Sequence, residues 1–288
     1  MMNKYTNLVL SSGSFYSFSF IGCLKYLEDI DILKDIKNFV GTSGGSLVCL
    51  FYVIGYSPIE IYNFIVSECV GKDIVKYDLT SILSLTTTLG LCDHSKIKDI
   101  LEKALINKQY EKTATIIDVV KKTGKNIVFC TCNINKGIPE YLSVDSHPDI
   151  PIITATLMSC CIPILFQPIK YNDEYYLDGG IVDPFPYSIC ESVQLNCKNT
   201  LCIAVCFSKP KFVVNELDNI NFVDYFQHII ELYKYYTFKT PSEDKGYSFI
   251  KINFENRDDL FNFNGFELEV LNKYIEEGYM SAKKYFKI

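Results

Sequence analysis

The pentapeptide Gly41-Thr-Ser-Gly-Gly45 has the pattern G-x-S-x-G, in which the central serine can act as a nucleophile. It lies between a strand-like run over residues 37–40 and a helix-like apolar run over residues 46–54. A strand that turns directly into a helix holds the residue at the turn in a strained conformation, and side chains two positions away on either side would collide. Gly41 and Gly45 avoid that collision. Ser43 is therefore the first candidate nucleophile, close to the positive end of the following helix.

A second candidate group ends a predicted β-hairpin. Residues 164–169 and 174–177 form its two arms around Tyr171-Asn172-Asp173, and the second arm runs into Asp178-Gly179-Gly180. Taken alone, an aspartate at this place favours a cap of its own turn. A carboxylate here could also serve the serine, so both interpretations stay open.

The elements around these residues alternate between strand and helix. Residues 7–10 read as a buried strand, and residues 17–30 have apolar side chains at helical spacing. Ser57-Pro58-Ile59-Glu60 is a capping box that opens a helix to about Glu68. Successive βα units predict a mostly parallel sheet covered by helices on both faces. Further strands are expected at 126–133 and 200–206, and further helices at 95–107, 222–236 and 267–286.

Two segments allow more than one interpretation. Residues 78–91 have no strong period, and we expect a buried connector there rather than a lid or a lipid-facing flap. The aromatic run Phe15, Tyr16, Phe18 and Phe20 could enter a lipid interface or pack in the core.

Composition favours an α/β domain that spans residues 1–288. Hydrophobic residues make up 48% of the 288 residues, which supports a large core, and no Pro/Gly/Ser-rich linker divides the chain. The net charge is -6 and Arg257 is the only arginine, so a nucleic-acid partner is not expected. No apolar run reaches the ~20 residues of a transmembrane span. The sequence gives no indication of oligomeric state.

The twelve cysteines favour a reducing compartment, because many lie inside apolar runs where a thiol packs as a small hydrophobic group. Cys130 and Cys132 are one residue too close for a zinc-binding pair, so we expect neither a metal nor another cofactor. With no signal peptide recognised, these features predict a cytoplasmic protein that can also bind membranes peripherally.

Taken together, the motifs resemble the patatin-like phospholipase family over nearly the whole chain. Residues 155–163 (ATLMSCCIP) are similar to the family's alanine-serine helix that ends in Ile-Pro, and Phe166-Gln167-Pro168 is similar to its Phe-x-Pro. Residues 178–186 (DGGIVDPFP) resemble its Asp-Gly-Gly block. The resemblance implies a three-layer α/β/α fold and metal-independent hydrolysis of carboxylic esters in phospholipids or other acyl lipids, at a membrane or micelle surface.

The same resemblance implies a catalytic dyad, with Ser43 as nucleophile and Asp178 as general base. An ordinary aspartate is too acidic for this task near neutral pH, so it must touch the serine oxygen in a partly desolvated site. Gly179 and Gly180 permit the tight backbone beside it.

The oxyanion loop departs from the family pattern. The family has Gly-Gly-Gly-x-basic-Gly where this chain has residues 12–17, Ser-Gly-Ser-Phe-Tyr-Ser. The resemblance implies that backbone N–H groups of Ser12, Gly13 and Ser14 hold the oxyanion. The lost glycines also suggest an alternative, a catalytically silent protein that binds lipid or a partner. Labelling of Ser43 by a fluorophosphonate would distinguish the two.

A triad with histidine is not expected. An α/β-hydrolase needs its histidine after the acid, and among His94, His147 and His228 only His228 follows Asp178. It lies in an apolar-periodic helical pattern, which favours a packed or surface side chain.

Overall fold

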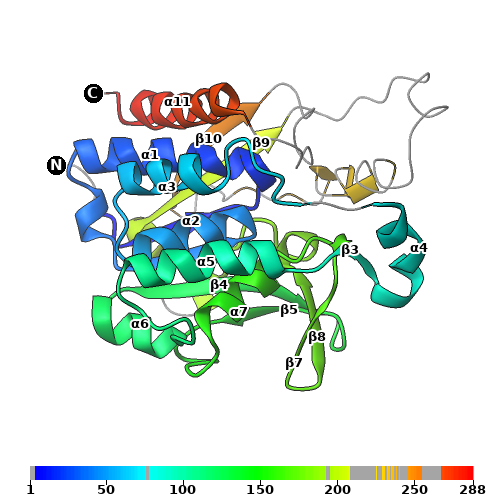
Figure 1. Cartoon of the computed structure of the whole chain (residues 1–288). Helices are drawn as coiled ribbons and strands as arrows, with labels where there is room; N and C mark the ends of the chain where they lie inside the picture. Colours follow the sequence, from blue (N-terminus) through cyan, green and yellow to red (C-terminus); the bar gives the residue numbers. More distant parts are fainter. Residues whose placement is uncertain are drawn as a thin grey trace.

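The computed structural model describes residues 4–75, 78–192, 195–207, 225, 229–230, 232–233, 235–236, 238, 240, 246–254 and 267–287. A mixed sheet runs through its centre in the strand order β10-β9-β1-β2-β4-β8-β7, and β5 pairs with β4 (Figure 1). The sheet comprises β1 (Asn7–Leu10), β2 (Asn38–Thr42), β4 (Asn126–Asn133), β5 (Ile138–Leu142), β7 (Ile169–Tyr171), β8 (Glu174–Asp178), β9 (Thr200–Phe207) and β10 (Ser248–Phe254).

The strands β10, β9, β1, β2 and β4 are parallel, as the βα units predict. Their side chains alternate between two apolar layers, because successive residues of a strand point to opposite faces. Leu8 and Phe39 belong to the larger core, whereas Val9 and Val40 pack with Phe185 in the smaller one. The fold is therefore α/β with a mostly parallel central sheet between two apolar layers, as the sequence predicts.

Helices supply the remaining layers. They are α1 (Ser19–Asp29), α2 (Gly44–Val53), α3 (Pro58–Glu68), α4 (Leu79–Thr88), α5 (Ser95–Asn107), α6 (Ile116–Thr123), α7 (Ile152–Ser159), α8 (Ile189–Ser192) and α11 (Leu268–Phe286). The capping box of α3 is confirmed, since Ser57 Oγ accepts from the Glu60 N–H and a Glu60 oxygen accepts from the Ser57 N–H. The expected helix over 222–236 falls mostly outside the described residues.

Helices α1 and α11 pack with their backbones in contact (Figure 1). A Cβ atom built on Gly22 of α1 would lie 1.9 Å from the carbonyl oxygen of Ile275. A Cβ atom on Gly278 of α11 would lie 1.7 Å from the carbonyl oxygen of Ser19. Only glycine allows the two helices to approach this closely.

Two predicted elements differ in the structure. The expected hairpin arm over residues 164–169 is split, because β6 (Ile164–Phe166) pairs with β3 (Gly90–Cys92) and only β7 pairs with β8. Residues 78–91 are not a buried connector. They form the exposed helix α4 and strand β3, and α4 stands at one end of the molecule (Figure 1).

In the aromatic run near the N-terminus, Tyr16 and Phe20 pack in the core, whereas Phe15 and Phe18 line the cavity beside Ser43. Tyr16 is only 2% exposed and packs on Phe207, Phe254 and Tyr274 at ring-centroid distances of 5.0, 4.6 and 4.7 Å. Phe20 is fully buried. The lipid-interface interpretation is therefore wrong for Tyr16 and Phe20.

Candidate active site

The sheet brings the predicted nucleophile and base together. β2 runs along β4 until Thr42 lies opposite Cys130, and the antiparallel β8 runs toward it until Asp178 lies opposite Thr131. Both strands lie on the same side of β4, since β5 occupies its other side over these residues. β2 and β8 therefore meet end to end. Ser43, the residue after β2, accordingly lies next to Asp178.

The Ser43 hydroxyl donates a hydrogen bond of 2.6 Å to Asp178 Oδ2. The other carboxylate oxygen, Oδ1, accepts from the N–H of Gly180 at 2.6 Å. The two interpretations of this aspartate are thus both present in the structure, one on each oxygen. Because the turn fixes the carboxylate through Oδ1, Oδ2 is held in place for the serine.

The backbone of Ser43 is strained as the pentapeptide predicts, with φ 55° and ψ -127°. A Cβ atom on Gly41 would lie 2.6 Å from the backbone nitrogen of Ser46, and one on Gly45 would lie 2.4 Å from the carbonyl oxygen of Ser11. Gly179 is similarly confined, since its Cβ would lie 2.3 Å from the carbonyl oxygen of Cys130. These glycines are required by the close backbone approach around the serine.

Ser159 also supports the strained turn, and the sequence does not single it out. Its hydroxyl accepts from the Ser43 N–H at 3.0 Å and donates to the carbonyl oxygen of Cys130 at 2.7 Å. The residue lies at the end of α7, within the alanine-serine helix already quoted. The alanine-serine helix motif is the only sign of Ser159 in the sequence. Its hydrogen bonds to Ser43 and Cys130 become visible only in the fold.

The predicted oxyanion loop lies beside the serine, with one correction. The N–H of Ser12 donates to the carbonyl oxygen of Pro184 at 2.7 Å, so it does not remain for an oxyanion. Ser14 adopts φ 48°, a left-handed value that favours glycine, and it lines the same cavity as Ser43. The loop thus forms with a serine at the strained position, and its candidate donors reduce to Gly13 and Ser14.

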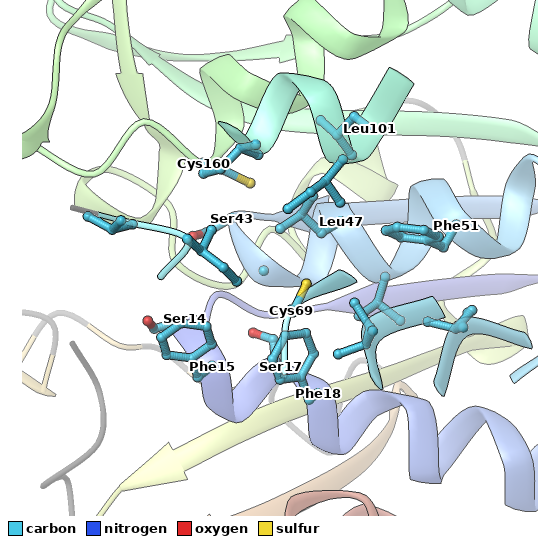
Figure 2. Close-up of a pocket in the computed structure, with 18 of the residues that line it drawn as sticks. Ser14, Phe15, Ser17, Phe18, Ser43, Leu47, Phe51, Cys69, Leu101 and Cys160 are labelled. Atoms are coloured by element: carbon cyan, nitrogen blue, oxygen red, sulfur yellow. The ribbon is translucent and has the colours of Figure 1, made fainter. Parts of the chain in front are cut away.

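An apolar cavity opens beside Ser43 (Figure 2). No described residue that lines it carries a charge. Its walls come from α1, α2, α3 and α5, and the apolar residues include Leu47, Phe51, Ile65, Ile97, Ile100 and Leu101.

The cysteines at the cavity are not competing nucleophiles. Burial and then the charge of Asp178 raise the pKa of the Cys160 thiol well above its usual value. Burial raises the pKa of Cys69 to about 12. A thiol acts as a nucleophile only when ionised, so both stay protonated near neutral pH. All twelve cysteines of the chain are free thiols.

The two described histidines contact groups other than Ser43. His94 Nε2 lies 2.8 Å from the carbonyl oxygen of Gln167, and burial lowers the pKa of its imidazole. His147 Nε2 lies 3.3 Å from Glu140. His228 lies outside the described residues, so its assignment stays a prediction. In the described part of the chain, no three His, Cys, Asp or Glu side chains gather as a metal site would need.

We expect His228→Gln to change the rate of ester hydrolysis by no more than a few fold, and EDTA to have no effect. The reason is that Ser43 Oγ already donates its hydrogen bond to the Asp178 carboxylate. Initial rates with a medium-chain p-nitrophenyl ester measure this. A loss of ~100-fold or more in His228→Gln, the scale of a lost general base, would instead support a triad.

Comparison with known proteins agrees with these features. The profile of the patatin-like phospholipase family matches residues 8–190. The chain is 34% identical over 187 residues to "Probable lipid hydrolase 463L" of Invertebrate iridescent virus 6, which covers 64% of this chain and 63% of that protein. It is 29% identical over 188 residues to an uncharacterized protein of Acanthamoeba polyphaga mimivirus, covering 65% of this chain and 62% of that protein. The matched stretch is thus under two thirds of either relative.

Among solved structures, VipD from Legionella pneumophila superposes with a TM-score of 0.57 at 15% identity, covering 99% of this chain and 67% of that chain. At this identity the likeness concerns the fold alone. The match over residues 8–190 includes the serine turn, Asp178 and the loop that faces them. The chain therefore belongs to the patatin-like phospholipase family.

Proposed function

We propose that this protein hydrolyses carboxylic esters of acyl lipids as a phospholipase A-type enzyme. One observation carries the proposal, the 2.6 Å hydrogen bond from Ser43 Oγ to Asp178 Oδ2 at the wall of an apolar cavity. The name of the viral relative, probable lipid hydrolase, supports the same class of reaction.

In the proposed reaction, Ser43 Oγ attacks the ester carbonyl carbon while Asp178 takes the hydroxyl proton. The carbonyl oxygen becomes an oxyanion beside the loop that contains Gly13 and Ser14. The ester C–O bond then breaks and the leaving alcohol takes the proton, which leaves an acyl-enzyme. Water attacks this intermediate with Asp178 again as base, and the fatty acid is released.

The cavity fits the acyl part of such a substrate. Apolar side chains such as Leu47, Phe51 and Leu101 replace water around the chain (Figure 2). Each buried methylene group contributes about 0.8 kcal/mol, so a long chain is bound without any charged contact. The polar part of the lipid then lies at the mouth, outside this lining.

In this proposal the protein takes its substrate from a lipid surface, and it contacts that surface through α4. This helix has no charged residue, and Leu79 and Leu83 are 71% and 74% exposed. It follows shortly after Ile74 and Val75, which line the cavity, so the chain leads from the cavity to this helix. Within the described ranges no single helix has the length and composition of a membrane span, although the sharply bent pair of α2 and α3 reaches that composition together.

We expect the double variant Leu79→Ser/Leu83→Ser to bind phosphatidylcholine vesicles on the order of 100-fold more weakly, because each leucine contributes about 1.5 kcal/mol or more when it leaves water. Vesicle co-sedimentation measures binding. Hydrolysis of a short soluble ester should not change. Ile106→Ser on α5, another exposed apolar side chain, is the matched control. Unaltered vesicle binding in the double variant would exclude α4 as the contact.

A second candidate is a catalytically silent lipid-binding protein. The observation that favours it is the loop, where Ser14 holds a positive φ and the Ser12 N–H is already bonded. A silent protein would keep the cavity and lose only the stabilisation of the oxyanion.

A fluorophosphonate probe with a long alkyl chain separates the two candidates. The proposed enzyme should be labelled at Ser43 and should release fatty acid from phospholipid vesicles, and excess substrate should slow the labelling. Peptide mapping locates the label, and Ser43→Ala should abolish it. A folded protein that binds the lipid but is neither labelled nor active would be the silent form.

A further inference from the structure

The hydroxyl of Ser17 is buried, with the residue only 2% exposed, and it has no hydrogen-bond partner in the described part of the chain. A buried polar group of this kind costs free energy and calls for a reason such as a bound molecule. Ser19, two residues later, contrasts with it, because its hydroxyl donates to the carbonyl oxygen of Tyr16 at 2.6 Å. Ser17 thus keeps its donor available.

The Ser17 hydroxyl lies beside Gly44, the residue that follows the candidate nucleophile. Ser17 lines the cavity together with Ser43 and Gly44. Its oxygen would lie 2.4 Å from a Cβ atom on Gly44 and 2.8 Å from one on Gly13. The oxygen therefore lies between the residue that follows the nucleophile and the predicted oxyanion loop. Ser17 belongs to a short 3₁₀ helix, Ser14–Phe18, and Figure 2 shows its side chain at the cavity.

We propose that Ser17 is a catalytic residue whose hydroxyl donates a hydrogen bond to the carbonyl oxygen of the reacting ester. This inference rests on the proposed function. When Ser43 Oγ bonds to the carbonyl carbon, the π electron pair of the carbonyl moves to its oxygen. The Ser17 O–H binds that oxygen without giving up its proton, and the bond strengthens as negative charge develops. When the C–O bond to the alcohol breaks, the electron pair returns to form the ester carbonyl of the acyl-enzyme.

The composition of the loop supports a side-chain donor. Ser17 stands where the family's loop has its last glycine, and Ser12 and Ser14 stand at two others. The Ser12 N–H is bonded to Pro184, so one backbone donor is lost from this loop. A hydroxyl placed between Gly13 and Gly44 supplies a donor at the same point. The glycine replacements are then a change in the kind of donor rather than a loss of the oxyanion site.

The test is Ser17→Ala, compared with Ser19→Ala as a structural control. Removing an oxyanion donor costs about 10²-fold in kcat. We expect that loss in Ser17→Ala, a KM within a few fold of wild type, and no fall in the urea midpoint. Ser19→Ala should instead lower the midpoint and keep kcat. Rates are measured with a medium-chain p-nitrophenyl ester.

Inhibitors give a second readout. A long-chain alkyl trifluoromethyl ketone forms a tetrahedral oxyanion adduct with a serine, whereas an alkanol of equal length only fills the cavity. In Ser17→Ala, the inhibition constant of the ketone should rise in proportion to the loss of kcat. The inhibition constant of the alkanol should stay unchanged. An active enzyme whose Ser17→Ala variant keeps its kcat and its ketone affinity overturns the Ser17 assignment alone. A wild-type protein that hydrolyses no ester overturns the proposed function and this assignment with it.

Discussion

Ser43→Ala and Asp178→Asn are each expected to reduce ester hydrolysis on the order of 10³-fold or more, to near background. Ser43→Ala has no hydroxyl to attack the ester, and Asp178→Asn has no carboxylate to take the proton of the serine hydroxyl. Because the two residues act as one unit, the double variant should be no worse than either single one. Release of p-nitrophenol from a medium-chain ester measures the rates.

Asparagine has nearly the same shape as aspartate, so a loss of activity in Asp178→Asn reports the loss of the negative charge. Its side-chain oxygen can still accept from the Gly180 N–H, the bond that fixes the turn at 2.6 Å. Circular dichroism and the urea midpoint of both variants should therefore stay near wild type. Substantial hydrolysis by folded Ser43→Ala would contradict the mechanism.

Ser14→Pro is expected to lower kcat on the order of 10²-fold or more, while Ser14→Gly should preserve or raise it. Proline removes the backbone N–H and fixes φ near -65°, whereas Ser14 has φ 48°. Glycine keeps the N–H and adopts the positive φ at little cost. The same chromogenic assay measures both variants.

Ser14→Ala is the control for this pair, because it removes only the hydroxyl and keeps both the N–H and the positive φ. It should remain within a few fold of wild type. Near-ultraviolet circular dichroism tests whether Ser14→Pro still folds. Equal kcat in the glycine and proline variants would show that the Ser14 backbone does not bind the oxyanion.

The parts that sequence predicts best are those with local causes. The strand before Ser43, the helix after it and the two glycines follow from one steric requirement at the turn. The capping box of α3 is equally local, since its two hydrogen bonds join residues three positions apart. The order of strands around β4 is not local. The sequence does not predict it.

Other features depend on contacts that spacing cannot reveal. Residues 164–166 pair with β3, which lies about seventy residues earlier, so a hairpin reading of the segment was wrong. The exposure of α4 depends on the absence of a neighbouring layer within the described residues, although its leucines resemble those of a core helix. Ser17 and Ser159 are ordinary serines in the sequence. Only the folded chain shows that Ser17 has no hydrogen-bond partner among the described residues and that Ser159 is bonded to the Ser43 N–H.

The contact between α1 and α11 has a consequence for where the folding unit ends. The family match stops at residue 190, but Gly278 lies against Ser19 and β9 pairs with β1 in the middle of the sheet. A fragment cut at residue 190 would leave β1 as an open edge and one side of α1 uncovered. We therefore expect β9, β10 and α11 to unfold together with the serine turn rather than as an accessory segment. A bulky side chain at Gly278 would then inactivate Ser43 from far along the chain, by loss of the fold and not of the chemistry.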